Sequence, residues 1–228
     1  MLTLPWHKIE TVFLDMDGTL LDLHFDNHFW LKHLPMRYAQ KHELSVEAAL
    51  DKLNPRFEAV HGTLDWYCVD YWERELEMDI LELKHEVAHL IDVFPYVTGF
   101  LDSVRSHGKR VVLVTNAHEK SLNLKMERTQ LGGHFDHIYT SHEFRAPKES
   151  QAFWHRLHEV EGFKAAHTLM IDDTLSVLRS ARDYGIGHLL AVKRPDSKQP
   201  LRDTQEFPAI ASFAEITPPI PENAHPSA

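Results

Sequence analysis

Residues 11–20 read TVFLDMDGTL, an apolar run that ends abruptly at two acids and a glycine. The run from Thr11 to Leu14 does not alternate with polar residues, which is typical of a strand buried on both faces of a parallel sheet. Asp15 and Asp17 follow at once, and Gly18 permits a tight turn after them. Ligands of open parallel sheets bind beyond the carboxyl ends of the strands. The stretch therefore predicts a central strand that delivers two acids to a binding site.

Further strand-like runs alternate with helical patterns along the chain. We expect the strands at residues 110–115, 137–141, 168–171 and 188–192, of which 137–141 has the weakest pattern. Apolar residues spaced three or four apart predict helices between them, at residues 98–108, 118–131, 147–160 and 174–184. The third helix is expected to begin at Pro147, because proline is accepted in a first helical turn. This order predicts an α/β fold with a Rossmann-like parallel sheet.

Residues 22–95 interrupt the alternation. They contain no convincing strand but carry helical patterns, for example at residues 45–54 and 66–77. We predict an all-helical insertion here, a core formed by residues 1–21 and 96–194, and a separate C-terminal segment over 195–228. That last segment holds 7 of the 12 prolines, and we expect it to be loosely attached, with order at residues 209–216.

Composition excludes several classes of protein. The 228 residues are 43% hydrophobic and 25% charged, which is typical of a globular chain. The formal net charge of −10 opposes binding to nucleic acid. The single cysteine, Cys68, rules out an internal disulfide, and no apolar run fits a membrane span or a signal peptide. We expect a cytoplasmic protein with neither nucleic acid nor membrane as a partner; the sequence does not set an oligomeric state.

Polar residues also follow the other predicted strands. Thr115 and Asn116 end the second strand, Asp172 and Asp173 end the fourth, and Lys148 follows the weak third strand. Four carboxylates that meet at one sheet edge repel each other unless a cation lies among them, and oxygen ligands favour a hard ion such as Mg²⁺. A lysine, a hydroxyl and an amide beside that ion would stabilise a phosphoryl group in transfer.

Asp15 and Asp17 alternate along an extended segment, so they can project to different sides of one bound group. This arrangement suits a nucleophile and a general acid and base. The segment is not a calcium-binding EF-hand, because that loop needs a third acid before its glycine and follows a helix. The sequence has 18 histidines but no HExxH motif, so zinc is not expected.

Taken in order, these residues resemble the four motifs of the haloacid dehalogenase superfamily: Asp15-x-Asp17-Gly18-Thr19-Leu20, then Thr115, then Lys148, then Asp172-Asp173. The resemblance implies that Asp15 forms an aspartyl-phosphate, while Asp17 protonates the leaving oxygen and later activates water. It also implies Mg²⁺ bound by the Asp15 carboxylate, the Asp17 main-chain carbonyl and the Asp172-Asp173 pair. Within that pair we favour Asp173 as the direct ligand and Asp172 as a ligand through water.

The helical insertion after the first motif resembles the cap of one subfamily, which implies closure over the site about hinges near residues 21–22 and 95–99. Dehalogenases of the superfamily attack carbon and need no acid at the position of Asp17, so Asp17 favours phosphoryl transfer. A sugar-phosphate phosphatase and a phosphomutase remain alternatives on this fold. A catalytically silent binding protein is another, against which the intact set of acids and Lys148 argues.

Parts of the insertion carry a narrower resemblance. Several segments are similar to bacterial GMP/IMP 5′-nucleotidases of this superfamily, namely residues 14–23, 25–27, 29–30, 64–68, 70–72, 114–118 and 146–149. This resemblance implies a small-molecule phosphate ester as substrate, a purine nucleoside monophosphate. The candidate substrate-binding residues are then Asn116, His24, Asn27, Trp66 and Tyr67. The alternative interpretation is a polar hinge for His24 and Asn27, and helix packing for Trp66 and Tyr67.

Overall fold

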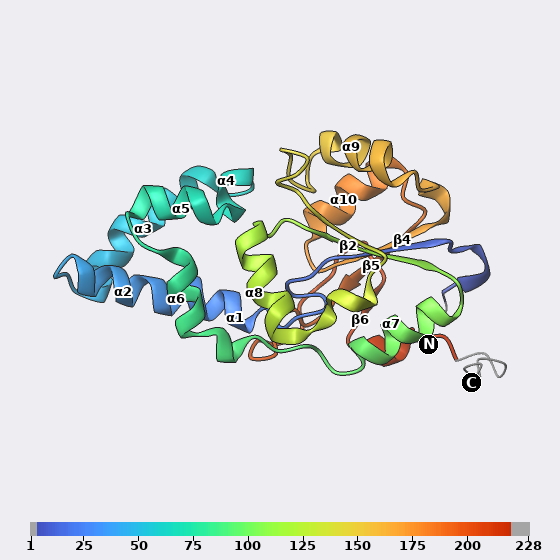
Figure 1. The fold of residues 1–228 in the computed structure, drawn as a ribbon, viewed down its shortest axis with the longest axis horizontal. Helices are drawn as coiled ribbons and strands as arrows, with labels where there is room; N and C mark the ends of the chain where they lie inside the picture. The colour runs from blue at the N-terminus through green and yellow to red at the C-terminus, as the bar shows by residue number, and fades with distance from the viewer. Residues whose placement is uncertain (1–3, 220–228) are drawn as a thin grey trace.

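The computed structural model describes residues 4–219, and a six-stranded parallel sheet lies at its centre (Figure 1). The strands are β1 (Thr11–Leu14), β2 (Arg110–Thr115), β3 (His137–Thr140), β4 (Thr168–Asp172), β5 (His188–Val192) and β6 (Ala209–Ile210). They pair in the order β3-β2-β1-β4-β5-β6. The predicted strands and the parallel α/β fold are confirmed, and β1 lies between β2 and β4.

Helices cover both faces of this sheet (Figure 1). They are α7 (Val97–Ser106), α8 (Glu119–Thr129), α9 (Gln151–Glu161) and α10 (Leu175–Tyr184). Along β1, Val12 and Leu14 pack into the same core as α7 and α8, whereas Phe13 packs with α9 and α10. All three side chains are fully buried. Burial on both faces explains why this run has no polar alternation.

The helix expected to begin at Pro147 starts later, so that prediction is wrong. Residues 147–150 form a turn closed by a hydrogen bond from Ser150 N to Pro147 O at 2.9 Å. The Ser150 hydroxyl then accepts from Ala152 N and caps α9. The reason is a tertiary contact: Lys148 N donates to Asn116 Oδ1 at 2.9 Å, and this bond holds the turn that directs Lys148 into the sheet edge rather than along a helix.

The insertion between β1 and β2 is helical, as predicted, and its helices lie together beside the sheet (Figure 1). They are α1 (His24–His28), α2 (Leu34–Lys41), α3 (Val46–Val60), α4 (Leu64–Tyr67), α5 (Val69–Leu76) and α6 (Ile80–Glu86), with a π-helical turn at Phe29–His33. The single helix expected at residues 66–77 is interrupted at Cys68, whose Sγ accepts from Tyr71 N at 3.4 Å and caps α5. Across residues 4–219, we find no helix with the length and apolar character that a membrane span requires.

Residues 195–219 pack against the core, so the prediction of a loosely attached segment is wrong for this part, whereas the order expected at residues 209–216 is present. The strand β6 extends the sheet beside β5, and Phe207 and Phe213 are buried. Asp196 is 3% exposed and accepts a hydrogen bond from the Asn27 side chain at 2.8 Å. The segment therefore braces the start of the insertion. Residues 220–228, the rest of the predicted segment, lie outside the described residues.

Candidate active site

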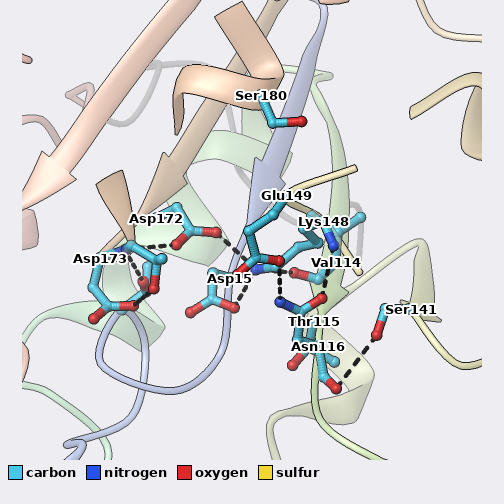
Figure 2. A network of polar contacts seen from close by, with 12 residues as sticks. Asp15, Val114, Thr115, Asn116, Ser141, Lys148, Glu149, Asp172, Asp173 and Ser180 are labelled. Carbon is cyan, nitrogen blue, oxygen red and sulfur yellow. Dashed lines mark hydrogen bonds and ion pairs between the residues drawn. The ribbon is translucent and has the colours of Figure 1, made fainter. Parts of the chain in front are cut away.

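The carboxyl ends of β1, β2 and β4 bring Asp15, Thr115, Asp172 and Asp173 to one place (Figure 2). Asp15 directly follows β1, and its N–H donates to Ile171 O of the neighbouring strand at 3.0 Å. Asp172 ends β4 and Asp173 follows it. Oxygens of these three buried carboxylates lie within 4.8 Å of one another. Neighbouring parallel strands thus assemble three of the four expected carboxylates at one edge of the sheet, whereas the Asp17 carboxylate is outside this cluster and pairs with Lys125.

Lys148 lies among these acids, as Figure 2 shows. Its Nζ donates to Asp15 Oδ1 at 2.5 Å, to Asp172 Oδ2 at 2.7 Å and to Val114 O at 3.1 Å. The side chain is 2% exposed. Burial lowers the pKa of the ammonium, but the two carboxylates more than compensate and hold this pKa well above its ordinary value. Lys148 therefore carries a fixed positive charge at the site.

The two acids after β4 differ in what they bind. Asp172 uses both carboxylate oxygens within the protein, because Oδ2 accepts from Lys148 and Oδ1 accepts from Thr174 N at 2.7 Å. Asp173 has weaker contacts: Oδ1 accepts from the Thr174 hydroxyl at 3.3 Å, and Arg202 lies 3.7 Å from Oδ2. The Thr19 hydroxyl accepts from Asp173 N at 3.1 Å and fixes its backbone. The Asp173 carboxylate is thus better placed to coordinate a bound ion.

The electrostatics of the cluster favour a cation. Burial is the main cause that raises the pKa of Asp173 to about 7, and repulsion by Asp15 adds to it. Burial also raises the pKa of Asp172 well above its ordinary value. The three carboxylates outnumber the two cations beside them, Lys148 and Arg202, so the cluster keeps a net negative charge that a bound cation would offset. The donors are all oxygen, which suits a hard ion. The residues present can therefore bind a metal ion.

Thr115 and Asn116 lie beside the acids at the end of β2 (Figure 2). The Thr115 hydroxyl oxygen accepts from Ala117 N at 3.0 Å, so its own proton is free to donate to a ligand. Asn116 Oδ1 accepts from Lys148 N at 2.9 Å, and its amide donates to Glu149 Oε2 at 3.0 Å. Glu149, which the sequence analysis missed, thereby holds Asn116 and the turn that carries Lys148.

A cavity of about 620 Å³ extends from these residues to the insertion. Asn27, Trp66 and Tyr67 line it, together with Asp15, Asp17, Thr115, Asn116 and Lys148. Trp66 also packs against Trp30 with the ring planes 24° apart, so helix packing and cavity lining apply to the same indole. The Tyr67 hydroxyl donates to Glu149 Oε1 at 2.9 Å and joins the insertion to the core.

His24 is not among the lining residues, so the structure does not bring it into the cavity. Its Nδ1 lies 3.6 Å from Asp196 Oδ1. The physical reason is the packed C-terminal segment, whose buried carboxylate attracts this ring and the Asn27 amide. His24 therefore matches the hinge interpretation better than the substrate-binding one.

Two buried lysines were missed by the sequence analysis. Lys125 of α8 and Lys84 of α6 both lie against Asp26, and Lys125 also pairs with Asp17. A signal was present, because each lysine occupies the apolar stripe of its helix, three residues after Leu122 and four after Ile80. A lysine at such a position indicates a buried partner of opposite charge.

Comparisons with known proteins agree with this geometry. The haloacid dehalogenase-like hydrolase family matches residues 9–185. A protein named GMP/IMP nucleotidase YrfG from Escherichia coli (strain K12) is 36% identical over 219 residues, covering 96% of this chain and 99% of that protein. A protein of the same name from Shigella flexneri matches equally.

Solved structures share the fold. A HAD phosphatase from Thermococcus onnurineus superposes with a TM-score of 0.73 at 21% identity, covering 91% of this chain and 95% of that one. A putative β-phosphoglucomutase from Thermotoga maritima superposes with a TM-score of 0.65 at 19% identity, covering 92% of this chain and 97% of that one. The family match spans most of the chain and includes Asp15, Lys148, Asp172 and Asp173, which meet at one sheet edge. The chain therefore belongs to the haloacid dehalogenase-like hydrolase family, as an enzyme of the phosphatase kind.

Proposed function

We propose that the protein is a Mg²⁺-dependent phosphomonoesterase that forms an aspartyl-phosphate on Asp15 and acts on purine 5′-nucleotides such as GMP and IMP. The observation that carries the chemistry is the buried cluster of Asp15, Asp172 and Asp173 with Lys148 bridging two of its acids. The substrate rests on the 36% identity to a protein named a GMP/IMP nucleotidase. The cytoplasmic location expected from the composition stays a prediction.

The proposed reaction has two steps at one phosphorus atom. Asp15 Oδ1 is held by Lys148, so Oδ2 attacks phosphorus while the bond to the nucleoside oxygen breaks and Asp17 gives that oxygen a proton. Water then attacks the phosphorus, Asp17 takes a proton from it, and Asp15 departs from inorganic phosphate as a carboxylate. Lys148 and the Thr115 hydroxyl stabilise the negative phosphoryl oxygens in both steps.

Mg²⁺ would be held by the carboxylates of Asp15 and Asp173 and by the main-chain carbonyl of Asp17, with Asp172 contributing through water. The engagement of both Asp172 oxygens within the protein supports this assignment. When bound, the ion supplies positive charge to the phosphoryl oxygens. The direct test is release of phosphate from GMP by the purified protein with Mg²⁺ and with EDTA. Absence of Mg²⁺-dependent release across a broad panel of phosphate esters would reject the proposal.

The proposal includes a cap formed by residues 22–95 that closes over a core of residues 1–21 and 96–194. Contacts between the insertion and the core support it. The Tyr67 hydroxyl reaches Glu149, and Lys120 of the core lies 2.7 Å from Asp70 and 2.7 Å from Glu73 of the insertion. Closure about hinges near residues 21–22 and 95–99 would exclude bulk water from the phosphoenzyme.

We expect the stabilisation that Asp173 contributes to the metal-free protein to be lost as the pH rises from about 4 to about 7. The folded pKa of Asp173, about 7, lies above its ordinary value of 3.8, so the unfolded chain releases this proton first. The stabilisation is present below about pH 4 and is lost as the pH rises through 7. Asp17, whose pKa burial raises to about 6, acts in the same direction.

Melting curves in EDTA at several pH values would measure this loss, and added Mg²⁺ should reduce it. Asp173→Asn is the control, because it removes the acid and should flatten the dependence. If the wild type and Asp173→Asn show the same pH dependence of stability in EDTA, Asp173 is not the cause of that dependence.

Gly18→Ala is expected to lower kcat/KM by about 10²-fold or more, since a displacement of about 1 Å at a catalytic group costs that much. Gly18 has φ of +81°, and an added Cβ would lie 2.8 Å from Asp173 Cγ and 2.9 Å from Oδ2. The methyl group would therefore push the Asp173 carboxylate out of place. Steady-state kinetics at several Mg²⁺ concentrations would show the loss and a weaker response to the metal.

Gly108→Ala is the matched control for this change. Gly108 has φ of +67°, but an added Cβ meets no atom within 4 Å. It should therefore lose stability from backbone strain yet keep its kcat/KM. Equal losses of activity in the two variants would show that strain, not contact with Asp173, is responsible.

GMP and IMP are expected to exceed AMP in kcat/KM by at least about tenfold. Both have a carbonyl oxygen where adenine has an amine, so a donor in the cavity would meet a second donor in AMP. The single Tyr67 hydroxyl proton already goes to Glu149, which leaves Trp66 and the second N–H of the Asn27 amide as candidates for base contact. A sugar phosphate ranked first would reject the nucleotidase proposal, and an isomeric phosphate product would favour a mutase.

Trp66→Ala should then lower kcat/KM for GMP by about tenfold, given about 1–3 kcal/mol for stacking on a base. The value for 4-nitrophenyl phosphate should change far less. Trp6→Ala is the control, because Trp6 packs on Phe100 and does not line the cavity. In Trp6→Ala, the ratio of kcat/KM for GMP to kcat/KM for 4-nitrophenyl phosphate should stay at the wild-type value.

A further inference from the structure

A buried ionic cluster lies next to Asp17, outside the acidic cluster that binds the phosphoryl group in the proposal. The Nζ of Lys125 lies 2.7 Å from Asp17 Oδ1 and 2.7 Å from Asp26 Oδ2. The Nζ of Lys84 lies 3.3 Å from Asp26 Oδ1. The side chains of Lys125 and Lys84 are 2% and 3% exposed. Burying two ammonium groups is costly, and ion pairs in the interior do not by themselves repay that cost in stability.

The four charged groups come from separate parts of the fold. Asp17 belongs to the loop after β1, Lys125 to α8 of the core, Asp26 to α1 and Lys84 to α6 of the insertion. Lys84 also lies 4.5 Å from the ring centre of Phe29. Asp26 thus accepts from both lysines and keeps the Lys125 ammonium from moving freely toward Asp17 or away from it. The position of this ammonium is well defined.

The contact occupies one oxygen of Asp17 and leaves the other available. Among residues 4–219, Lys125 is the residue that forms an ion pair with the Asp17 carboxylate, which is otherwise 22% exposed toward the cavity. A carboxyl group on a loop can rotate, and a proton donor must be held at hydrogen-bond distance from the atom it protonates. The ion pair with Lys125, at 2.7 Å from Asp17 Oδ1, restricts this rotation.

We infer that Lys125 is a positioning residue for proton transfer from Asp17: its ammonium holds Oδ1, so that Oδ2 carries the proton to the departing oxygen, and Asp26 holds the ammonium in place. The inference rests on the proposed function, in which the bond from phosphorus to the substrate oxygen breaks as this proton moves. The competing role is structural, in which the cluster merely joins the insertion to the core.

Two esters of similar shape separate these roles. Benzyl phosphate leaves as an alkoxide that needs a proton, whereas 4-nitrophenyl phosphate leaves as a stable phenolate that needs none. The value of kcat/KM reports the steps up to departure of the leaving group and excludes hydrolysis of the phosphoenzyme. Lys125→Met is expected to lower kcat/KM for benzyl phosphate by about 10²-fold, a typical contribution of general acid catalysis. The value for 4-nitrophenyl phosphate should fall by a few-fold at most.

Lys84→Met is the matched control, because it removes an equally buried ammonium that contacts Asp26 but not Asp17. In Lys84→Met, the ratio of the kcat/KM values for the two esters should stay near that of the wild type. Equal losses for both esters in Lys125→Met would overturn the inference and leave the phosphatase chemistry intact. If Lys125→Met does not fold, Lys125→Gln is measured, and the same change in ratio is expected.

Failure of both Lys125 variants to fold would assign the residue to structure and also overturn the inference. A wild-type protein that hydrolyses neither ester with Mg²⁺ would instead reject the proposed function. The two failures are therefore distinguishable.

Discussion

Asp15→Asn is expected to lower phosphatase turnover by at least about 10⁴-fold while the protein stays folded, because an amide is a poor nucleophile and the side chain keeps its size. Asp15 is 6% exposed, and its Oδ1 is held by Lys148, so the remaining oxygen is the atom that faces a bound phosphoryl group. Phosphate release under saturating Mg²⁺ would measure the loss, with circular dichroism as the test of folding.

Asp183→Asn is the control for this substitution. Asp183 lies on α10 with a side chain that is 66% exposed, so the same chemical change there should leave turnover unaltered. Turnover near the wild-type value in Asp15→Asn, with the substitution verified by mass, would contradict the covalent mechanism. Spontaneous deamidation back to aspartate would be detected in the same mass measurement.

Lys148→Met is expected to lower turnover by about 10³-fold, a typical loss when a preorganised charge is removed from a transition state. The substitution also leaves Asp15 and Asp172 buried without their ammonium partner. Breaking such a pair costs about 3–5 kcal/mol. The free energy of unfolding should therefore fall by roughly this amount in EDTA and by less with Mg²⁺ present.

The surface pair of Lys164 and Glu10 provides the comparison for this loss. The Lys164 side chain is 69% exposed, so Lys164→Met should change both stability and turnover very little. If Lys148→Met keeps most of its activity, the ammonium does not stabilise the phosphoryl group. If it keeps its stability in EDTA as well, the buried ion pairs do not hold the acids together.

The sequence predicted the sheet and its catalytic edge because both follow from short, local patterns. The run from Thr11 to Leu14 is apolar without alternation, and this pattern can be satisfied in few ways other than burial on both faces. The acids and Thr115 were assigned to one site from their positions at strand ends. Parallel pairing of β1 with β2 and β4 makes these ends neighbours.

Features set by contacts between distant segments could not be predicted in the same way. Asp26 and Lys125 are 99 residues apart, and no local pattern pairs a lysine with one particular acid. The C-terminal segment was expected to be loose because of its prolines, but Phe207 and Phe213 supply the apolar area that attaches it. Its buried Asp196 then draws His24 away from the cavity, a contact between residues 172 positions apart.

The start of α9, which lies at Gln151 rather than at Pro147, was predicted wrongly for a related reason. Proline is compatible with a first helical turn and with a tight turn alike, so local preference leaves both open. The hydrogen bond from Lys148 N to Asn116 Oδ1 favours the turn. This bond requires Asn116, which follows β2 and lies 32 residues earlier in the chain. Specific tertiary contacts thus override the local signal at the site itself.

The most direct test is to identify the residue that carries phosphate during turnover. The protein is mixed with 4-nitrophenyl phosphate and Mg²⁺, quenched in acid within the first turnover, and digested for peptide mass mapping. If Asp15 is the nucleophile, phosphate will be found on the peptide that contains Asp15, will be lost on treatment with hydroxylamine, and will be absent in Asp15→Asn. Release of nitrophenol during that turnover with phosphate on another residue, or with none on the protein, would contradict this role of Asp15.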